Sequence, residues 1–262
     1  MKTRLDAELV RRELARSRDS AVELINAGKV LVNGIPATKA ATQVDAQISI
    51  TLKDDQADFV SRGGHKLAGA LDHFSNLVVT DKVVLDAGAS TGGFTDVLLK
   101  RGAKKVIAAD VGYGQLAWQL QKDSRVKVLD RVNVRSLTIE QVGQEVDLVV
   151  ADLSFISLEL VLPALIAVAK DDADFLLMVK PQFEVGKGKL GAGGVVRDSS
   201  LRKEAVTAVA NAAFALGLGC FGVVASPLPG PSGNVEYFLW LSKAGPALLE
   251  VDLDLAIEKG PA

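Results

Sequence analysis

Cysteine, histidine and aromatic residues are all scarce in this chain. Of its 262 residues one is a cysteine, two are histidines and 5% are aromatic. The lone Cys220 cannot form a disulfide within the chain, which favours a reducing, cytoplasmic location. His65 and His73 form no cluster with it, so we predict no metal site. These absences exclude a disulfide-stabilised secreted scaffold and a zinc-binding domain.

Charge is missing from one long stretch, residues 205–227, which is long enough to raise the question of a membrane span. The stretch contains Thr207 and Asn211, and Gly217-Leu218-Gly219 is typical of a helix end followed by a strand. We therefore predict a buried helix and strand here, and no membrane association. The N-terminus is charged without an apolar core, so we also expect no signal peptide.

Positive charge is concentrated near the N-terminus, although the whole chain has a net charge of -2. Residues 1–40 hold eight Lys or Arg against five Asp or Glu. Helical spacing of leucines, a helix cap at Ser17 and a hairpin turn at Asn33-Gly34 predict two helices followed by short strands. Residues 3–52 resemble the RNA-binding module named after ribosomal protein S-four. The resemblance implies that arginines contact RNA phosphates, namely Arg4, Arg11, Arg16 and Arg18.

The rest of the chain alternates between strand and helix patterns. Strands are predicted over 83–86, 105–109, 126–129, 146–151, 175–179, 221–225 and 237–241, and helices over 92–101, 115–121, 157–169 and 201–216. This pattern predicts an α/β fold with a doubly wound sheet. We divide the chain into a small α+β RNA-binding domain (1–56), a polar linker (57–64) and the α/β domain (65–262).

A glycine-rich turn follows the first of these strands. It lacks the Gly-x-Gly-x-x-Gly spacing of dinucleotide-binding folds and the Walker lysine, and Asp86 ends the strand, where it could receive a cationic amino-acid group. Asp110 ends the second strand, at the position that binds ribose hydroxyls. Together these features resemble the class I (Rossmann-like) methyltransferases, with an NAD-type domain as the alternative. The predicted S-adenosylmethionine site comprises Asp86, Gly88, Ser90, Thr91, Gly92, Gly93, Phe94, Asp110, Asp130 and Asn133.

Four ionisable residues are predicted at the ligand edge of the sheet. Asp152 and Lys180 follow the fourth and fifth strands, and Lys66 follows the linker. We expect the last strand to be antiparallel, which returns Glu236 to the same edge. This Lys-Asp-Lys-Glu set resembles the tetrad of FtsJ-like ribose 2′-O-methyltransferases. A ribose hydroxyl must lose its proton as the methyl group arrives, and Lys180 is our candidate to accept or steer that proton.

Other target atoms fit these motifs less well. Exocyclic-amine methyltransferases present Asn/Asp-Pro-Pro-aromatic after the fourth strand, where this chain has Asp152-Leu153-Ser154-Phe155. Pyrimidine C5 methylation needs a cysteine nucleophile, and Cys220 lies in an apolar run. The loop with Lys187 and Lys189 is either a basic lid over RNA or a solvated loop.

Several motifs together resemble the TlyA family over nearly the whole chain: Ser61–Leu67, Asp86–Asp96, Asp152–Ser157 and Lys180–Glu184. The resemblance implies 2′-O-methylation of cytidine in 16S or 23S ribosomal RNA, or both, within ribosomal subunits, which affects sensitivity to capreomycin-type antibiotics. Some members join their domains through Arg-x-Trp-Val, a linker tied to cofactor binding. This chain has Ala57-Asp58-Phe59-Val60 instead, which puts such a linker switch in doubt.

Two other functions stay open from the sequence. One is a ribosome-assembly factor that binds RNA with an inactive site, which calorimetry with S-adenosylmethionine would distinguish. The other is a pore-forming haemolysin, suggested by an older family name and by the uncharged 205–227 stretch. No second span accompanies that stretch in the sequence, which argues against a pore.

Overall fold

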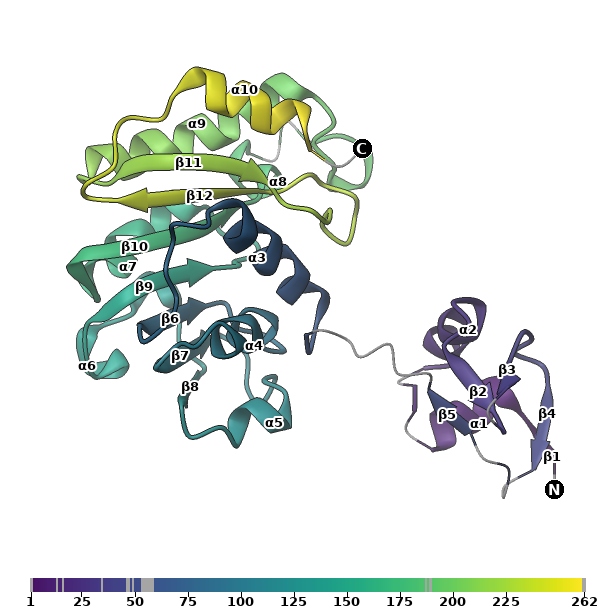
Figure 1. The fold of residues 1–262 in the computed structure, drawn as a ribbon. Helices are drawn as coiled ribbons and strands as arrows, with labels where there is room; N and C mark the ends of the chain where they lie inside the picture. The colour runs from purple at the N-terminus through teal and green to yellow at the C-terminus, as the bar shows by residue number, and fades with distance from the viewer. Residues whose placement is uncertain are drawn as a thin grey trace. The chain divides into compact units, whose positions relative to one another are not determined.

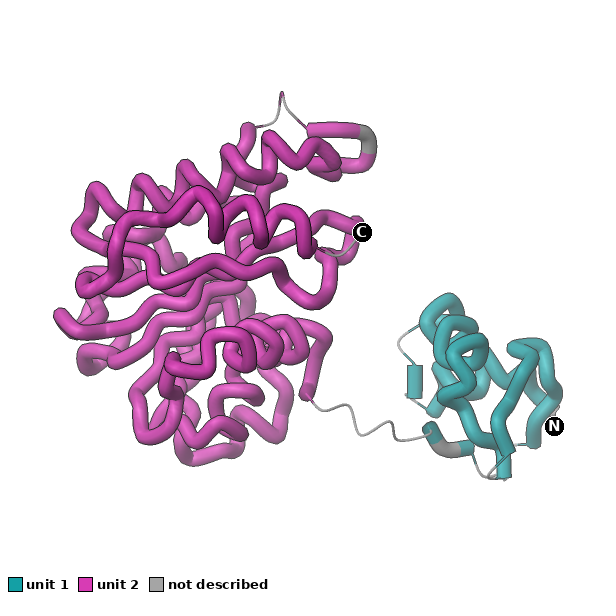
Figure 2. Tube along the Cα trace, turned by 45° about the horizontal axis from the view of Figure 1, so that its top comes forward, with its two compact units in different colours: residues 1–58 teal, residues 59–262 magenta. Residues whose placement is uncertain are grey.

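A computed structural model describes residues 2–12, 14–15, 17–33, 35–45, 48, 50–52, 59–186, 188 and 190–260. The chain forms two compact units, residues 1–58 and 59–262 (Figure 2). The boundary differs from the expected linker over 57–64. Residues 59–64 belong to the second unit, because helix α3 (Arg62–His73) already begins there.

The first unit is a small α+β domain, as predicted. Its elements are β1 (Lys2–Arg4), α1 (Leu5–Arg11), α2 (Arg18–Asn26), β2 (Val30–Val32), β3 (Ile35–Pro36), β4 (Gln43–Asp45) and β5 (Ile50–Leu52). Strands β1 and β4 form one small sheet and β3-β2-β5 another. The predicted cap is confirmed, since the Ser17 hydroxyl accepts a hydrogen bond from the Ser20 amide at 3.1 Å. Leu5, Leu9 and Ile25 fill the core beneath the helices.

The second unit is built on a seven-stranded sheet whose order is β11-β12-β10-β9-β6-β7-β8 (Figure 1). Its strands are β6 (Val83–Ala87), β7 (Lys105–Asp110), β8 (Val126–Asp130), β9 (Val146–Ala151), β10 (Ala169–Val179), β11 (Gly219–Ala225) and β12 (Tyr237–Ser242). In this sheet β12 is antiparallel to both of its neighbours, β10 and β11, and the other pairings are parallel. The predicted doubly wound sheet with an antiparallel last strand is therefore confirmed.

Helices cover both faces of this sheet, and each face has its own apolar core. One core lies under α3, α4 (Gly93–Lys100) and α5 (Trp118–Gln121). The other core lies under α7 (Leu162–Ala167), α9 (Ser199–Ala215) and α10 (Glu250–Glu258). Short helices complete the unit: η1 (Val134–Ser136), α6 (Ile139–Val142), η2 (Leu158–Leu160), α8 (Pro181–Glu184) and η4 (Ala192–Gly194).

Two predicted helices differ in detail, and four α-helices of the second unit were missed. The predicted helix over 115–121 begins only at Trp118, as α5. The predicted helix over 157–169 is divided into η2 and α7, with a proline near the start of α7. Helices α3, α6, α8 and α10 were not predicted. The uncharged stretch 205–227 lies in α9 and β11, as expected, and Val206 and Val209 are fully buried. Within the part of the chain that the structure describes, no helix is long and apolar enough to cross a membrane.

The central strand β9 packs against both cores, so truncation of its side chains should be costly. Leu148 is fully buried, and we expect Leu148→Ala to lower the free energy of unfolding by ~2–5 kcal/mol. Leu255→Ala is the matched control, because Leu255 is 48% exposed and its truncation should cost under about 1 kcal/mol. Both tryptophans, Trp118 and Trp240, lie in the second unit, so urea titration followed by tryptophan fluorescence reports this unit alone. Equal losses in the two variants would contradict the prediction.

Candidate active site

The glycine-rich turn between β6 and α4 has two positions with no room for a side chain. Gly88 has a φ of +88°, and a Cβ there would lie 2.5 Å from the backbone oxygen of Asp152. Gly92 has a φ of +98°, and a Cβ there would meet the Leu120 side chain at 2.3 Å. Both positions therefore require glycine. Between them, Ser90 also has a positive φ of 47°, so three residues of the turn leave the usual backbone region.

Asp86 lies buried beneath this turn. One carboxylate oxygen accepts a hydrogen bond from the Thr95 hydroxyl in the first turn of α4 at 2.6 Å. The other oxygen, Oδ1, is buried without a hydrogen-bond partner among the described residues. Burial raises the pKa of Asp86 to about 7, and the Thr95 hydrogen bond offsets only part of this rise. The structure thus places a carboxyl group with one open oxygen under the predicted cofactor turn.

Asp110, at the end of β7, is held rigidly by backbone groups. Its carboxylate accepts the Ser90 amide at 2.8 Å and the Gly112 amide at 2.7 Å. This contact joins the glycine-rich turn to the end of the next strand. Asp130, at the end of β8, accepts the Gly114 amide at 3.1 Å in the same way. The two carboxylates therefore line one edge of the sheet, as their positions in the sequence predict.

The remaining residues of the predicted cofactor site have local structural roles as well. The Asn133 side chain accepts the Arg135 amide at 3.0 Å and begins η1, while the side chain itself is exposed. Thr91 accepts the Ala117 amide at 3.0 Å through its carbonyl. Phe94 is buried against Phe238 in the core, so only its backbone is available at the turn.

Lys66 and Glu236 form a buried ion pair with 2.5 Å between Nζ and Oε2. Only 8% of the Lys66 side chain and 1% of the Glu236 side chain are exposed. Lys66 lies in the second turn of α3, and Glu236 lies directly before β12. The two residues are 170 positions apart in the sequence, so the antiparallel last strand is what brings them together.

Lys180 and Asp152 form the second ion pair, also at 2.5 Å, and Lys180 donates a further hydrogen bond to the Ser154 hydroxyl at 3.1 Å. Val179 pairs with Tyr237 at the end of the β10–β12 ladder, so Lys180 and Glu236 lie directly beyond its last pair. The structure therefore brings the four predicted tetrad residues together as two ion pairs at the carboxyl edge of the parallel strands.

Phe155, Phe183 and Glu184 lie near Lys180. They belong to sequence motifs, but no individual role was predicted for them. Phe155 is 91% exposed, has a positive φ of 63°, and its ring lies 5.1 Å from that of Phe183. Glu184 accepts hydrogen bonds from the Ser157 hydroxyl and the Leu158 amide. Burial raises its pKa. An aromatic residue three positions beyond a strand-end aspartate is the signal that could have identified Phe155.

Three of the four predicted RNA-binding arginines of the first unit are paired with a carboxylate. Arg4 and Arg18 bind Asp6, and Arg11 binds Glu8. The guanidinium groups hold the pKa of Asp6 and of Glu8 at about 2. The arginine side chains are still 45–59% exposed, so they can contact a ligand. The other predicted RNA-binding residues, Arg16, Lys187 and Lys189, lie outside the described residues.

The end of the predicted linker packs onto the second unit. The Val60 amide donates a hydrogen bond to Asp96 of α4 at 2.9 Å. Phe59 contacts the His65 ring, and Lys100 lies 5.1 Å from the centre of the Phe59 ring. Phe59 stands where some TlyA members have tryptophan. This segment therefore contacts the helix that begins at the cofactor turn, whereas Ala57 and Asp58 lie outside the described residues.

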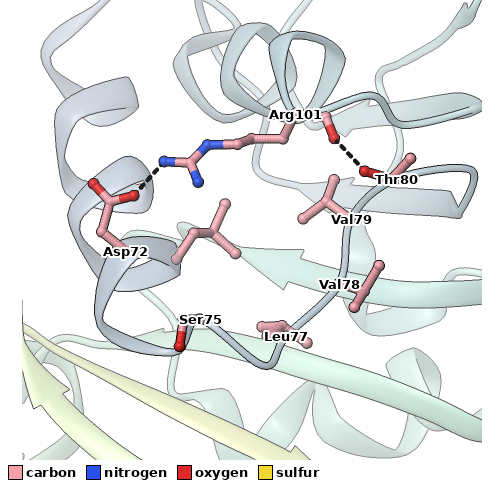
Figure 3. A pocket seen from close by; sticks show the side chains of 8 residues that line it. Asp72, Ser75, Leu77, Val78, Val79, Thr80 and Arg101 are labelled. Carbon is pink, nitrogen blue, oxygen red and sulfur yellow. Dashed lines mark hydrogen bonds and ion pairs between the residues drawn. The ribbon is translucent and has the colours of Figure 1, made fainter.

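A separate pocket of about 330 Å³ opens at the other edge of the sheet, where β6 begins (Figure 3). Leu71, Leu77 and Val79 form its apolar part. At its rim, Arg101 binds Asp72 at 2.5 Å, and its carbonyl accepts the Thr80 hydroxyl. None of the predicted site residues lines this pocket.

The fold and the glycine-rich turn define a class I methyltransferase domain. The FtsJ-like methyltransferase family matches residues 59–243, and the S4 domain matches residues 3–47. Relatives over the full length show further that the chain belongs to the TlyA family.

Three relatives illustrate the similarity. The TlyA 16S/23S rRNA (cytidine-2′-O)-methyltransferase of Mycobacterium tuberculosis is 59% identical over 99% of both chains. The 23S rRNA (cytidine-2′-O)-methyltransferase TlyA of Campylobacter jejuni is 32% identical, over 89% of this chain and 97% of its own. A solved structure described as a hemolysin from Streptococcus thermophilus is 36% identical, covers 98% of this chain and 95% of its own, and has a TM-score of 0.78.

Metal ligands do not gather anywhere in the region that the structure describes. Within it, no group of three or more His, Cys, Asp or Glu side chains could hold a metal ion.

The raised pKa of Asp86 gives the stability of the second unit a specific pH dependence. The folded state keeps the Asp86 proton up to a pH of about 7, whereas an unfolded aspartate loses it near 3.8. This contribution is complete below pH 3.8 and is lost as the pH rises through about 7. The wild-type protein should lose at most about 1.4 kcal/mol per pH unit across this window, relative to Asp86→Asn. Urea titrations at pH 5 and pH 8 measure the difference, and parallel pH dependence in both proteins would refute it.

Proposed function

We propose that this chain transfers the methyl group of S-adenosylmethionine to the ribose 2′ oxygen of cytidine in ribosomal RNA, in 16S rRNA, 23S rRNA or both, within ribosomal subunits. The observation that carries the proposal is the pair of ion pairs, Lys66–Glu236 and Lys180–Asp152, at the carboxyl edge of the sheet. The names of the M. tuberculosis and C. jejuni relatives support the substrate class.

The residues around the glycine-rich turn fit S-adenosylmethionine. The cofactor carries an amino group, a sulfonium and two ribose hydroxyls, and supplies an electrophilic methyl group when bound. The open oxygen of Asp86 beneath the turn suits a neighbouring cation. Asp110 uses its carboxylate for two backbone amides and keeps further acceptor positions for hydroxyl groups. Asp130 and Asn133 would lie at the adenine side, at the end of the third strand of the unit.

Lys180 is the residue we assign to the reacting hydroxyl. The reaction forms a bond between the 2′ oxygen and the methyl carbon and breaks the bond between that carbon and the sulfonium sulfur, which leaves as a neutral thioether. The hydroxyl proton is released to water. Asp152 and Ser154 fix the Lys180 ammonium group by two contacts, so its charge has a defined direction. In this arrangement Lys180 stabilises the ribose oxygen as negative charge develops on it. Lys66, fixed by Glu236, adds a second positive charge from α3.

The exposed ring of Phe155 supports an RNA substrate over a small molecule. It lies three residues from Asp152 and is 91% exposed. Exposed aromatic rings beside a catalytic group offer a stacking surface for an unpaired base, and stacking tolerates any base. We therefore assign Phe155 to the nucleotide that carries the reacting ribose, and the first unit to RNA contacts outside the site.

Replacement of Lys180 should abolish methyl transfer without loss of cofactor binding. With tritiated S-adenosylmethionine and ribosomal subunits, Lys180→Ala should lower the rate by about 100-fold or more. Calorimetry should give a dissociation constant for S-adenosylmethionine close to that of the wild type. Lys170→Ala is the control, since Lys170 lies on β10 far from the edge that carries Lys180. Mass mapping of ribose methylation in both rRNAs identifies the nucleotide, and equal incorporation by wild type and Lys180→Ala would refute the assignment.

Exposed arginines of the first unit should contribute to RNA affinity through phosphate contacts. Arg18→Ala and Arg11→Ala should each weaken binding to unrelated RNA sequences to a similar degree, and lower the slope of log Kd against log salt by about 1. Arg125→Ala is the matched control, because Arg125 pairs with Asp123 before the start of β8, away from the predicted ligand edge. Filter binding at several salt concentrations measures both quantities. An unchanged slope in Arg18→Ala and Arg11→Ala would contradict the role.

A further inference from the structure

Two chain segments supply the partners of the Lys180–Asp152 ion pair. The first is the β9 loop, residues 152–157, which follows strand β9. The second is the β10 segment, residues 180–184, which consists of Lys180 and helix α8. Strand pairing places the first residues of both segments beside each other, since Leu177 pairs with Ala151 and the Asp152 amide donates a hydrogen bond to the Ala87 carbonyl at 3.0 Å. The pairing does not extend to residues 153–157 and 181–184, so the course of the β9 loop around the Lys180–Asp152 ion pair depends on contacts between the two segments.

Glu184 makes two hydrogen bonds from the β10 segment to the far end of the β9 loop. Its Oε2 accepts the Ser157 hydroxyl at 2.5 Å, and its Oε1 accepts the Leu158 amide at 3.0 Å. Leu158 begins helix η2, so the carboxylate satisfies a free amide at the start of that helix. The Glu184 side chain is half-buried, and both of its oxygens are used on residues about 26 positions away.

These contacts lie on either side of Phe155, the exposed residue of the β9 loop. Phe155 lies between Asp152 and Ser157 and has a positive φ of 63°. A left-handed conformation is unfavourable for a phenylalanine, and it persists only where the surroundings hold it. Phe183, the neighbour of Glu184, contacts the Phe155 ring from the other segment at 5.1 Å. The Glu184 hydrogen bonds and this ring contact therefore fix the same loop.

We propose that Glu184 is a positioning residue: by bonding Ser157 and Leu158 it fixes the β9 loop against Lys180, and so sets the Lys180–Asp152 contact and the orientation of Phe155. Glu184 itself lies outside the proposed tetrad and takes no part in proton transfer. The inference about catalysis rests on the methyl transfer proposed above. The inference about the loop can be measured without any activity.

The test compares Glu184→Ala with Glu184→Gln. Alanine removes both acceptors, whereas glutamine keeps an acceptor for the Leu158 amide and nearly the same volume. Glu159→Ala is the matched control, since Glu159 is an exposed carboxylate two residues beyond Ser157. Three quantities are measured on the full chain: hydrogen–deuterium exchange of residues 153–160, kcat and KM for ribosomal subunits, and the calorimetric Kd for S-adenosylmethionine.

Glu184→Ala should speed exchange in residues 153–160 and lower kcat by about 10- to 100-fold, because a misplaced catalytic group has an effect of this size. The Kd for S-adenosylmethionine should stay within about twofold, since Glu184 contacts neither the glycine-rich turn nor Asp110. Glu184→Gln should recover kcat to within about threefold of the wild type, given that one of two hydrogen bonds survives. Glu159→Ala should match the wild type in all three measurements.

Three results would overturn the inference. Unchanged exchange in Glu184→Ala would show that Glu184 does not fix the loop. Faster exchange with an unchanged kcat would show that the loop position does not matter for the reaction. Loss of S-adenosylmethionine binding together with kcat would indicate general unfolding. A wild-type protein that methylates no subunit would instead refute the proposed function, and the exchange data would still decide whether Glu184 fixes the loop.

Discussion

The reversed direction of β12 is the constraint on which the rest of the active site depends. Because β12 runs antiparallel between β10 and β11, its first residues lie at the edge where the parallel strands end. Glu236 thereby reaches Lys66 on α3 and, like Lys180, lies directly beyond the last pair of the β10–β12 ladder. A parallel last strand would place Glu236 at the opposite edge of the sheet. The ion pair with Lys66 would then be lost.

Buried charge is concentrated at this edge, and function explains it better than stability does. Removing a lysine and a carboxylate from water costs several kcal/mol, which their attraction barely offsets, so an apolar pair would serve the fold as well as Lys66 and Glu236. Asp86 adds a carboxyl group whose pKa burial raises to about 7. These buried charged groups have a function when a cationic cofactor and a reacting hydroxyl bind at the same edge of the sheet.

The RNA-binding unit handles its charge differently. Its arginines are exposed, but Asp6 and Glu8 hold three of them in fixed directions. RNA phosphates would therefore meet arginines that are already oriented, and the neighbouring carboxylates limit the net attraction. This arrangement suits a domain that positions the enzyme on structured RNA. For such positioning, the directions of the arginine side chains contribute more to recognition than a large excess of positive charge does.

The sequence by itself determined the succession of strands along the chain, the two-domain division, the glycine-rich turn and the strand-end positions of the predicted tetrad residues, because these depend on local periodicity and turn chemistry. Residues 59–64 were assigned to a linker, since two glycines, Gly63 and Gly64, obscure the start of α3 in the sequence. In the structure, close contact with Phe59 leaves no room for a side chain at Gly64. Only the tertiary structure decided which lysine pairs with which carboxylate, and that Glu184 bonds Ser157 and Leu158. Those partners lie 26 to 170 residues apart, and no local pattern encodes a contact made by the crossing of separate segments.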